Sequence, residues 1–405
     1  MPWERSAMDR REEFVKLALQ PGANRTELSR RFGIARGNGY KWLKRYLAEG
    51  RAGLAERSRR PRRSPARSTA ATEAAVLAVR ENSNNAWGGR KIAHVLARNG
   101  EPDVPAPSTI TEILRRHGKL AEHEGEHPGP YCRFERETPN ELWQMDFKGD
   151  FVAGRGRCYP LTVIDDHSRY ALGVEACATQ QDRPTRERLT AVFRRYGLPD
   201  KMLMDNGSPW GDSSGGAFTT FTVWLLRLGV CVTHGRPYHP QTQGKDERFH
   251  RTLKAEVLNG REFADLIACQ AAFDRWRHVY NHERPHQALD LATPSARYRP
   301  SRRSFPETLP PIEYGPDDSV RKASSEGDIK FNNRRIRLGK PFRGELIALR
   351  ATTEDGVFSI HFFTQQIGTI DLRPAANSAC GFMDIATAMP TTPQAQQQKR
   401  IDKQL

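Results

Sequence analysis

Three carboxylates occupy positions from which they could hold metal ions. Asp146 lies in a predicted strand over residues 143–151, and Asp205 directly follows a predicted strand over residues 201–204. Glu247 lies near the start of a predicted helix. If the two strands are neighbours, the three acids converge at one edge of a sheet, and their hard oxygen ligands suit Mg²⁺. Two such ions about 3.5 to 4 Å apart support in-line phosphoryl displacement.

Spacing alone does not single out this triple, because residues 140–255 contain thirteen carboxylates and chance supplies many sets of three. Asp165 and Asp166 are alternative ligands, but their position between two predicted strands favours a solvated turn. Three histidines lie around the third acid: His234, His239 and His250. They could bind metal or orient phosphate, although an environment of Asp, Glu and Asn favours Mg²⁺.

The elements that would position these acids occupy residues 142–257. Three successive β-type runs, at 143–151, 159–164 and 170–176, predict an antiparallel meander. Alternating helices and strands follow: helix 185–196, strand 201–204, helix 218–228, strand 230–234 and helix 245–257. This order predicts a mixed sheet with helices on both faces.

The charge of the chain points to a polyanionic partner such as nucleic acid. The net charge is +16 and the isoelectric point is about 9.8. Residues 1–70 hold 18 Lys and Arg against 7 Asp and Glu, and their apolar spacing predicts a helix-turn-helix. The last helix supplies candidate DNA contacts: Arg36, Asn38, Lys41, Lys44 and Arg45. A three-helix bundle with a solvated basic face is the alternative.

Two further N-terminal segments also point toward DNA. Residues 57–67 contain six arginines and two prolines, which predicts an extended arm. Four of its arginines are candidates for the minor groove: Arg59, Arg60, Arg62 and Arg63. A solvated tether is equally compatible with this composition. Residues 72–120 predict a second helical DNA-binding unit, or a spacer, with a capping box at Thr109 and Glu112.

The C-terminal part has a different pattern. Six short β-type runs in residues 318–373 predict a small β-barrel. Residues 318–350 carry nine basic and four acidic side chains, so this part is a further candidate for DNA contact. Residues 374–405 are poor in apolar side chains and predict a disordered tail.

Several classes of protein are disfavoured. No apolar run approaches 18 residues and the N-terminus is polar, which argues against a membrane span or a signal peptide and favours a cytoplasmic protein. The six cysteines are never closer than 19 positions apart, so we expect neither a disulfide framework nor a Cys-x-x-Cys zinc site.

Four motifs carry a resemblance to a known family: WQMDF at 143–147, LMDNGSPW at 203–210, RPYHPQTQGKDERFHRTLK at 236–254 and YNHERPHQ at 280–287. Together they closely resemble bacterial insertion-sequence transposases of the retroviral-integrase superfamily, over at least residues 26–372. The resemblance implies an RNase H-like core whose Asp-Asp-Glu triad binds two Mg²⁺ or Mn²⁺ ions. By motif position the triad falls on Asp146, Asp205 and Glu247, and Arg251 and Lys254 would contact the DNA end.

Two features depart from the family pattern. Asp205 and Glu247 are 42 positions apart, about six more residues than the superfamily spacing, and the Gly-rich stretch 211–216 is the natural insertion. The His and Cys zinc site that retroviral integrases carry near the N-terminus has no counterpart here, so zinc is not predicted.

The sequence is therefore interpreted as a DNA transposase that binds terminal inverted repeats, cleaves DNA and joins it to target DNA, as a homo-oligomer. A DNA-binding repressor or domesticated regulator without turnover is the alternative, and a nonspecific nuclease is a third possibility. The predicted fold class is multidomain α/β. The predicted divisions are helix-turn-helix 1–56, Arg-rich linker 57–71, second helical domain 72–120, linker 121–139, catalytic core 140–300, linker 301–317, barrel 318–373 and tail 374–405.

Overall fold

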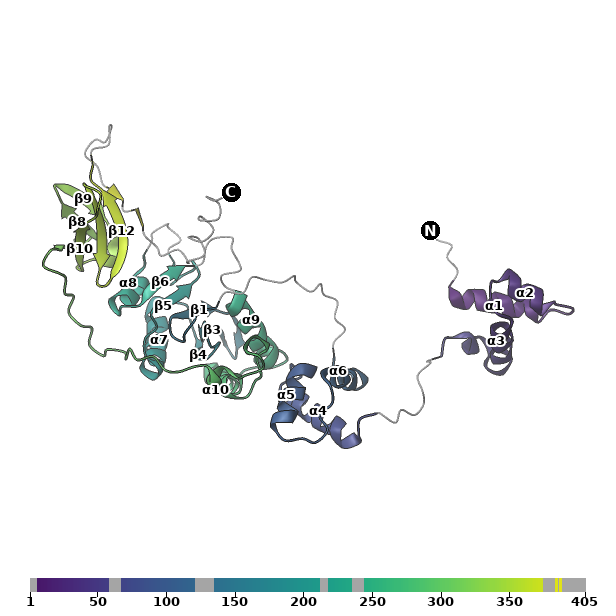
Figure 1. The fold of residues 1–405 in the computed structure, drawn as a ribbon. Coiled ribbons are helices and arrows are strands. Elements are labelled where there is room, and N and C mark those ends of the chain that lie inside the picture. Colours follow the sequence, from purple (N-terminus) through teal and green to yellow (C-terminus); the bar gives the residue numbers. More distant parts are fainter. Residues whose placement is uncertain are drawn as a thin grey trace. The chain divides into compact units, whose positions relative to one another are not determined.

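The computed structural model describes residues 6–57, 67–120, 135–211, 218–234, 244–373, 383–384 and 386–387. The chain folds as two compact units, Met1–Arg67 and Ser68–Leu405 (Figure 1). The four candidate arginines of the arm lie outside the described residues, as do His239 and nearly all of the predicted insertion 211–216.

The first unit is a three-helix domain. It contains α1 (Ala7–Ala18), α2 (Arg25–Arg31), α3 (Arg36–Glu49) and the 3-10 turn η1 (Gly50–Leu54). Phe14 and Val15 of α1 and Leu43 of α3 lie in its buried core. Gly39 costs helix propensity, yet it has a packing reason, because a Cβ there would lie 2.7 Å from the Phe14 ring. The helix-turn-helix arrangement expected from the sequence is present.

A second set of three helices begins the second unit: α4 (Ala70–Asn82), α5 (Gly89–Arg98) and α6 (Pro107–Arg116). Their apolar faces enclose a small core that includes Trp87, Ile92 and Ile110. The expected capping box is wrong, because α6 begins at Pro107 and Thr109 therefore lies inside the helix.

The central sheet has six strands: β1 (Leu142–Phe147), β2 (Phe151–Ala153), β3 (Gly156–Asp165), β4 (Ala171–Cys177), β5 (Lys201–Met204) and β6 (Cys231–His234). β3 is antiparallel to β1, β2 and β4, whereas β5 is parallel to both β1 and β6. The path through the sheet is therefore β4-β3-β1-β5-β6, with β2 forming a short hairpin on β3. The predicted mixed sheet is confirmed, and β1, β3 and β4 form the predicted meander. The single strand expected over 143–151 is wrong, because β1 ends at Phe147 and a separate strand, β2, begins at Phe151.

Helices cover both faces of this sheet, which gives the core two hydrophobic layers. The helices are α7 (Asp182–Tyr196), α8 (Thr220–Arg227), α9 (Gly244–Leu253), the π-helical segment η3 (Lys254–Leu258) and α10 (Leu266–His282). α7 and α8 pack on the face formed by Trp143, Met145 and Leu161. α9 and α10 pack on the opposite face, against Ile164 and Val174. The alternation of side chains along β1 turns Asp146 toward the α9 face.

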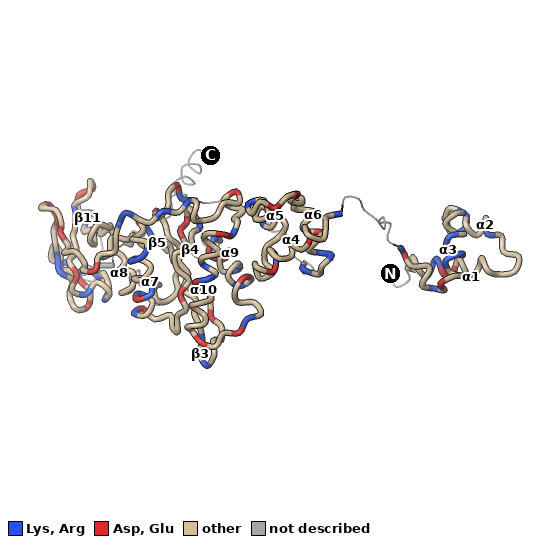
Figure 2. The backbone as a smooth tube through the Cα atoms, turned by 90° about the horizontal axis from the view of Figure 1, so that it is seen from below, with Lys and Arg blue, Asp and Glu red and all other residues tan. Residues whose placement is uncertain are grey.

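The C-terminal strands are β7 (Ser319–Lys322), β8 (Asp328–Phe331), β9 (Arg334–Arg337), β10 (Leu346–Ala351), β11 (Val357–Phe362) and β12 (Gln365–Asp371). Their order is β12-β11-β10-β7 in one sheet, while β8 and β9 pair in another. Among the described strands the ladder does not close, so the predicted barrel is not confirmed. Lys and Arg are frequent along these strands (Figure 2).

Two short strands lie within the segment predicted to be a disordered tail. β13 (Met383–Asp384) pairs with β9, and β14 (Ala386–Thr387) pairs with β12. The prediction is corrected for these residues, because backbone pairing with an existing strand requires no apolar side chains. Across the described parts of the chain, no helix combines the length and the apolar character needed to span a membrane.

Candidate active site

The structure brings two of the three predicted acids together. β1 and β5 pair in parallel with Trp143 opposite Met202 and Gln144 opposite Leu203. Continuing this register by two residues places Asp146 beside Asp205, which follows the last residue of β5. Both carboxylates therefore lie at the carboxyl ends of adjacent parallel strands.

The negative charges of Asp146 and Asp205 repel each other. Burial, followed by the negative charge of Asp205, raises the pKa of Asp146 from 3.8 to about 7. Only 23% of the Asp146 side chain is exposed, so water does little to screen this repulsion. A divalent cation would relieve both costs, because it supplies compensating charge to a pair of hard oxygen ligands. The donor set therefore fits Mg²⁺ or Mn²⁺.

The turn after β5 fixes the Asp205 carboxylate. Its Oδ1 accepts hydrogen bonds from the Gly207 backbone N–H, at 3.0 Å, and from the Trp210 indole N–H. Trp210 in turn stacks on Phe147 of β1, with ring centroids 5.3 Å apart. A Cβ at position 207 would lie 2.9 Å from Asp205 Oδ2, so any other residue there would displace this carboxylate. The DNGSPW motif thus orients one acid and ties its turn to the strand that carries the other.

Helix α9 passes the same site. His250 Nδ1 lies 3.9 Å from Asp146 Oδ2, and its Nε2 lies 2.8 Å from Thr162 Oγ1. Burial, followed by the positive charge of Lys148, lowers the pKa of His250 to about 4, so this imidazole is neutral at pH 7. Glu247 lies one helical turn before His250 and is exposed.

Asp246, the neighbour of Glu247, is the acid that the helix buries. Its side chain is 2% exposed, and its Oδ1 has no hydrogen-bond partner in the described part of the chain. Burial, followed by the charge of Asp146, raises the pKa of Asp246 well above its usual value. No three His, Cys, Asp or Glu side chains form a metal-binding cluster among the described residues. The structure therefore pairs Asp146 with Asp205 without bringing Glu247 into a ligating position.

Asp165 and Asp166 are fully buried, so the expectation of a solvated turn is wrong. Asp165 accepts hydrogen bonds from the backbone N–H groups of Ser168, at 2.8 Å, and Asn140, at 2.7 Å. Asp166 accepts from the Arg136 backbone N–H at 2.9 Å. The turn is covered because the chain segment that enters the core, residues 135–140, lies over it.

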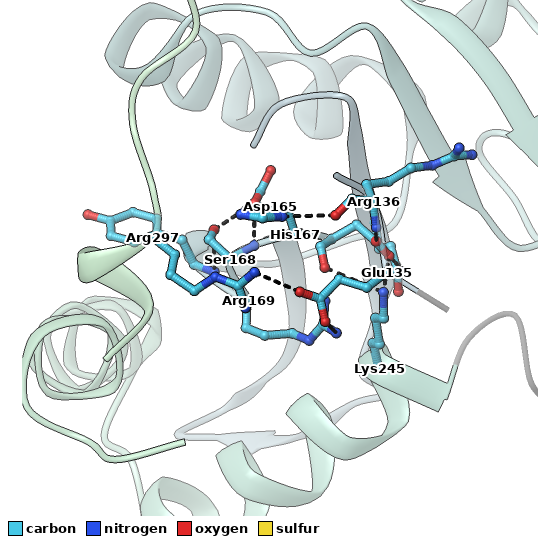
Figure 3. Close-up of polar contacts among 11 residues, drawn as sticks. Glu135, Arg136, Asp165, His167, Ser168, Arg169, Lys245 and Arg297 are labelled. Carbon is cyan, nitrogen blue, oxygen red and sulfur yellow. Dashed lines mark hydrogen bonds and ion pairs between the residues drawn. The ribbon is translucent and has the colours of Figure 1, made fainter. Parts of the chain in front are cut away.

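Asp166 also bonds to the start of α9. The Lys245 ammonium group donates to Asp166 Oδ1, and Gln144 Nε2 donates to the same oxygen at 2.6 Å. Burial lowers the pKa of Lys245 to about 8, against the opposing effect of Asp166. Figure 3 shows Lys245 reaching from its helix into this polar network, in which Glu135 bridges Arg169 and Arg297. Sequence reasoning missed this role, because the contacts join residues far apart along the chain.

Different protein families match successive segments of the chain. An integrase core domain family matches residues 136–240, and a second integrase core domain family matches residues 228–294. A helix-turn-helix domain matches residues 10–62, and a homeodomain-like domain matches residues 38–114. The C-terminal domain of IS481 family transposases matches residues 318–377.

Curated relatives come from the same kind of mobile element. The chain is 27% identical over 158 residues to an uncharacterized protein of insertion element IS407 from Burkholderia multivorans, covering 39% of this chain and 55% of that protein. It is also 27% identical over 164 residues to the transposase of insertion sequence element IS904 from Lactococcus lactis, covering 40% of this chain and 62% of that protein. The chain is therefore similar to insertion-sequence proteins, and two of its segments match integrase core domains. It spans about half to three fifths of the length of these relatives.

Solved structures similar to this chain include the simian T-cell lymphotropic virus intasome in complex with a PP2A regulatory subunit. The identity is 14% and the TM-score is 0.37, over 70% of this chain and 91% of that chain.

The candidate DNA contacts lie mostly on the surface of the protein. In the first unit, Arg36, Asn38, Lys41 and Lys44 of α3 are exposed, whereas Arg45 is half-buried. On α9 and η3, Arg251 and Lys254 are exposed.

Lys148 and His234 complete the surroundings of the two aspartates. Lys148 follows Asp146 by two positions, and burial, with the nearby charge of Lys254, lowers its pKa. Lys148 is thus a cation close to His250 and Lys254, and its place two residues after the first acid was the available sequence signal. His234 Nδ1 lies 2.7 Å from the backbone oxygen of Asp205, so this imidazole contacts the turn rather than a carboxylate.

Proposed function

We propose that this protein is a transposase, which binds the terminal inverted repeats of its element and catalyses metal-dependent cleavage of DNA and strand transfer into target DNA. The observation that carries the proposal is the pairing of Asp146 with Asp205 at the ends of adjacent parallel strands, within a region that matches integrase core domains. The sheet path β4-β3-β1-β5-β6, with three antiparallel and two parallel strands, supports an RNase H-like core.

Asp146, Asp205 and Glu247 would hold two Mg²⁺ or Mn²⁺ ions. Such ions, when bound, activate an attacking oxygen and neutralise charge during phosphoryl transfer. The chain's own residues orient this machinery, since Trp210 and Gly207 fix the Asp205 carboxylate and Thr162 holds the neutral His250 beside Asp146.

The basic side chains around the acids would place the DNA backbone. Lys148, Arg251 and Lys254 lie on the elements next to the carboxylates, where they can contact phosphates. The exposed residues of α3 would read the end sequence in the major groove. Because two element ends must be processed together, we infer that the active form is a homo-oligomer on DNA.

The test uses an oligonucleotide that carries the element end, with Mg²⁺. We expect Asp146→Asn and Asp205→Asn to abolish cleavage and joining while DNA binding persists, because Asn keeps the shape but removes the charge that holds the cations. Asp200→Asn is the matched control, since Asp200 is exposed and lies before β5 rather than after it. Retained strand transfer in either active-site variant would remove that residue from the site. Selective binding without cleavage by the wild type would favour a DNA-binding regulator.

A further inference from the structure

Glu256 is a buried carboxylate that the proposed chemistry does not use. It lies in η3, directly after α9, and is 8% exposed. Its Oε1 accepts hydrogen bonds from Trp87 Nε1, at 3.1 Å, and Arg284 Nε, at 2.9 Å. Its Oε2 accepts from Trp276 Nε1 at 2.8 Å. Three donors therefore satisfy both oxygens of one buried charge, as burial of a carboxylate requires.

These donors come from different parts of the second unit. Trp276 belongs to α10 and Arg284 to the segment just after it, on the same face of the core as α9. Trp87 belongs to the α4–α6 helices, where it packs in their small hydrophobic core. Asn84, from the same turn as Trp87, places its Nδ2 3.4 Å from the backbone oxygen of Ala255. The α4–α6 helices are thus bonded to the end of the helix that carries the proposed third acid.

α9 and η3 form one continuous helical segment, and its two glutamates have different surroundings. Glu247 is exposed on α9, whereas Glu256 is buried in η3, so the two carboxylates lie on different faces of the helical segment. Glu256 is bonded to Trp87 and Trp276, which leaves Glu247 available for its proposed role as the third acid. A rotation of α4–α6 against the core would break bonds to the same segment that presents Glu247.

We propose that α4–α6, which lie mostly within the homeodomain-like match, contact the DNA, and that Glu256 is a positioning residue that sets where this DNA meets the active site. Its hydrogen bond to Trp87 couples the placement of the DNA to the helix of the third acid, and so selects which phosphodiester is cut. This inference rests on the proposed function.

The deciding comparison uses two matched variants in the full chain. Trp87→Phe and Trp276→Phe each remove one indole donor to Glu256 and keep an aromatic ring, and both indoles are 6% exposed in the wild type. Of these two tryptophans, Trp87 joins α4–α6 to the core, whereas Trp276 belongs to the core itself. The two substitutions should therefore lower the melting temperature by similar amounts. If the bond from Trp87 to Glu256 places the DNA, only Trp87→Phe should change the position of cleavage.

Cleavage of an end-labelled oligonucleotide is mapped to single-nucleotide resolution for both variants and the wild type. Because a misplacement of about 1 Å can cost about 100-fold in rate, we expect Trp87→Phe to cut about 10- to 100-fold more slowly at the normal phosphodiester and to cut at its neighbours. Trp276→Phe should keep the normal position. Cutting by Trp87→Phe at the wild-type position alone, with no greater loss of rate than in Trp276→Phe, would overturn the inference.

A milder variant covers the case in which Trp87→Phe does not fold. Asn84 has a positive φ of 53°, so Asn84→Gly keeps the backbone conformation while removing the side chain that reaches Ala255. We expect a smaller spread of cleavage positions in the same direction, and an unchanged pattern would count against the coupling. A wild-type protein that binds the end but never cuts it would overturn the proposed function and this inference with it, whereas normal cutting by all the variants overturns the inference alone.

Discussion

Replacement of Asp146 by Asn should stabilise the metal-free protein, and the gain should depend on pH. Below the unfolded pKa of 3.8 the carboxyl is protonated in both states and carries no penalty. Between 3.8 and about 7 the folded protein keeps a proton that the unfolded chain has lost, so stability falls as pH rises. Above about 7 the side chain is charged in both states and the full penalty applies. Both proteins should lose stability across this window, because each contains Asp246 with its raised pKa, but the loss should be steeper in the wild type, which also carries Asp146.

The size of the effect follows from the two pKa values. The difference between about 7 and 3.8, at 1.36 kcal/mol for each pKa unit, gives an upper bound of about 4 kcal/mol. Nearly a quarter of the Asp146 side chain is exposed, so solvent reduces this figure, and we expect about 2 to 4 kcal/mol at pH 8.

Urea unfolding in EDTA, from pH 4 to pH 8.5, measures this difference in the free energy of unfolding. The two proteins should be nearly equally stable at pH 4 and should diverge as pH rises. Asp200→Asn, which removes an exposed carboxylate from the other end of β5, should follow the wild-type pH dependence much more closely. Saturating Mg²⁺ should stabilise the wild type more than Asp146→Asn. Parallel curves for wild type and Asp146→Asn would refute the view that burial and Asp205 destabilise the Asp146 charge.

Three other predictions concern the acids of α9, its first ion pair and the N-terminal unit. Glu247→Gln should eliminate Mg²⁺-dependent cleavage and joining, measured on pre-cut and uncut end oligonucleotides. Asp246→Asn should leave substantial activity, because burial already favours a neutral Asp246. The reverse result would make Asp246 the third ligand. Lys245→Met should lower the free energy of unfolding by about 3 kcal/mol, measured with urea at pH 7, because it leaves the buried Asp166 charge without its cation. Adding Asp166→Asn should recover part of that loss. If the losses of the two single variants simply add in the double variant, the two side chains are not energetically paired. Deleting residues 1–67 should abolish selective binding of the element end and make the dependence of DNA affinity on salt less steep, as measured by titrations at several salt concentrations. Circular dichroism should show that the core is still folded. Selective binding by the truncated chain would place end recognition elsewhere.

The order of elements in the core was predictable because each carries its own periodicity. The meander and the strand before Asp205 are marked by β-type runs and turn residues, and their order already favours a mixed sheet. The pairing register that sets Asp146 beside Asp205 was not predictable, because no local sequence pattern specifies which residue of β1 lies opposite which residue of β5. Six C-terminal strands were likewise predictable as strands, but their grouping into two sheets was not.

Burial at the turn between β3 and β4 was unpredictable for a different reason. Two adjacent aspartates between strands are typical of a solvated turn, and only the tertiary structure brings residues 135–140 over them. Lys245 reaches Asp166 across 79 positions of sequence, and Trp87 reaches Glu256 across 169. Each of these contacts pairs a polar group that local reasoning assigns to solvent with a partner from a distant segment.

These contacts bear on how the active site tolerates its own charge. Asp146 and Asp205 repel each other, yet parallel pairing of β1 with β5 and stacking of Trp210 on Phe147 keep their strands from separating. α9 is held near its start by Lys245 and Asp166, and Glu256, just beyond its end, bonds to Trp87. The acids therefore cannot relieve their repulsion by moving apart without breaking buried contacts. The remaining means of relief are protonation of Asp146 or the arrival of a cation, so the proposed metal binding would be coupled to proton release from Asp146.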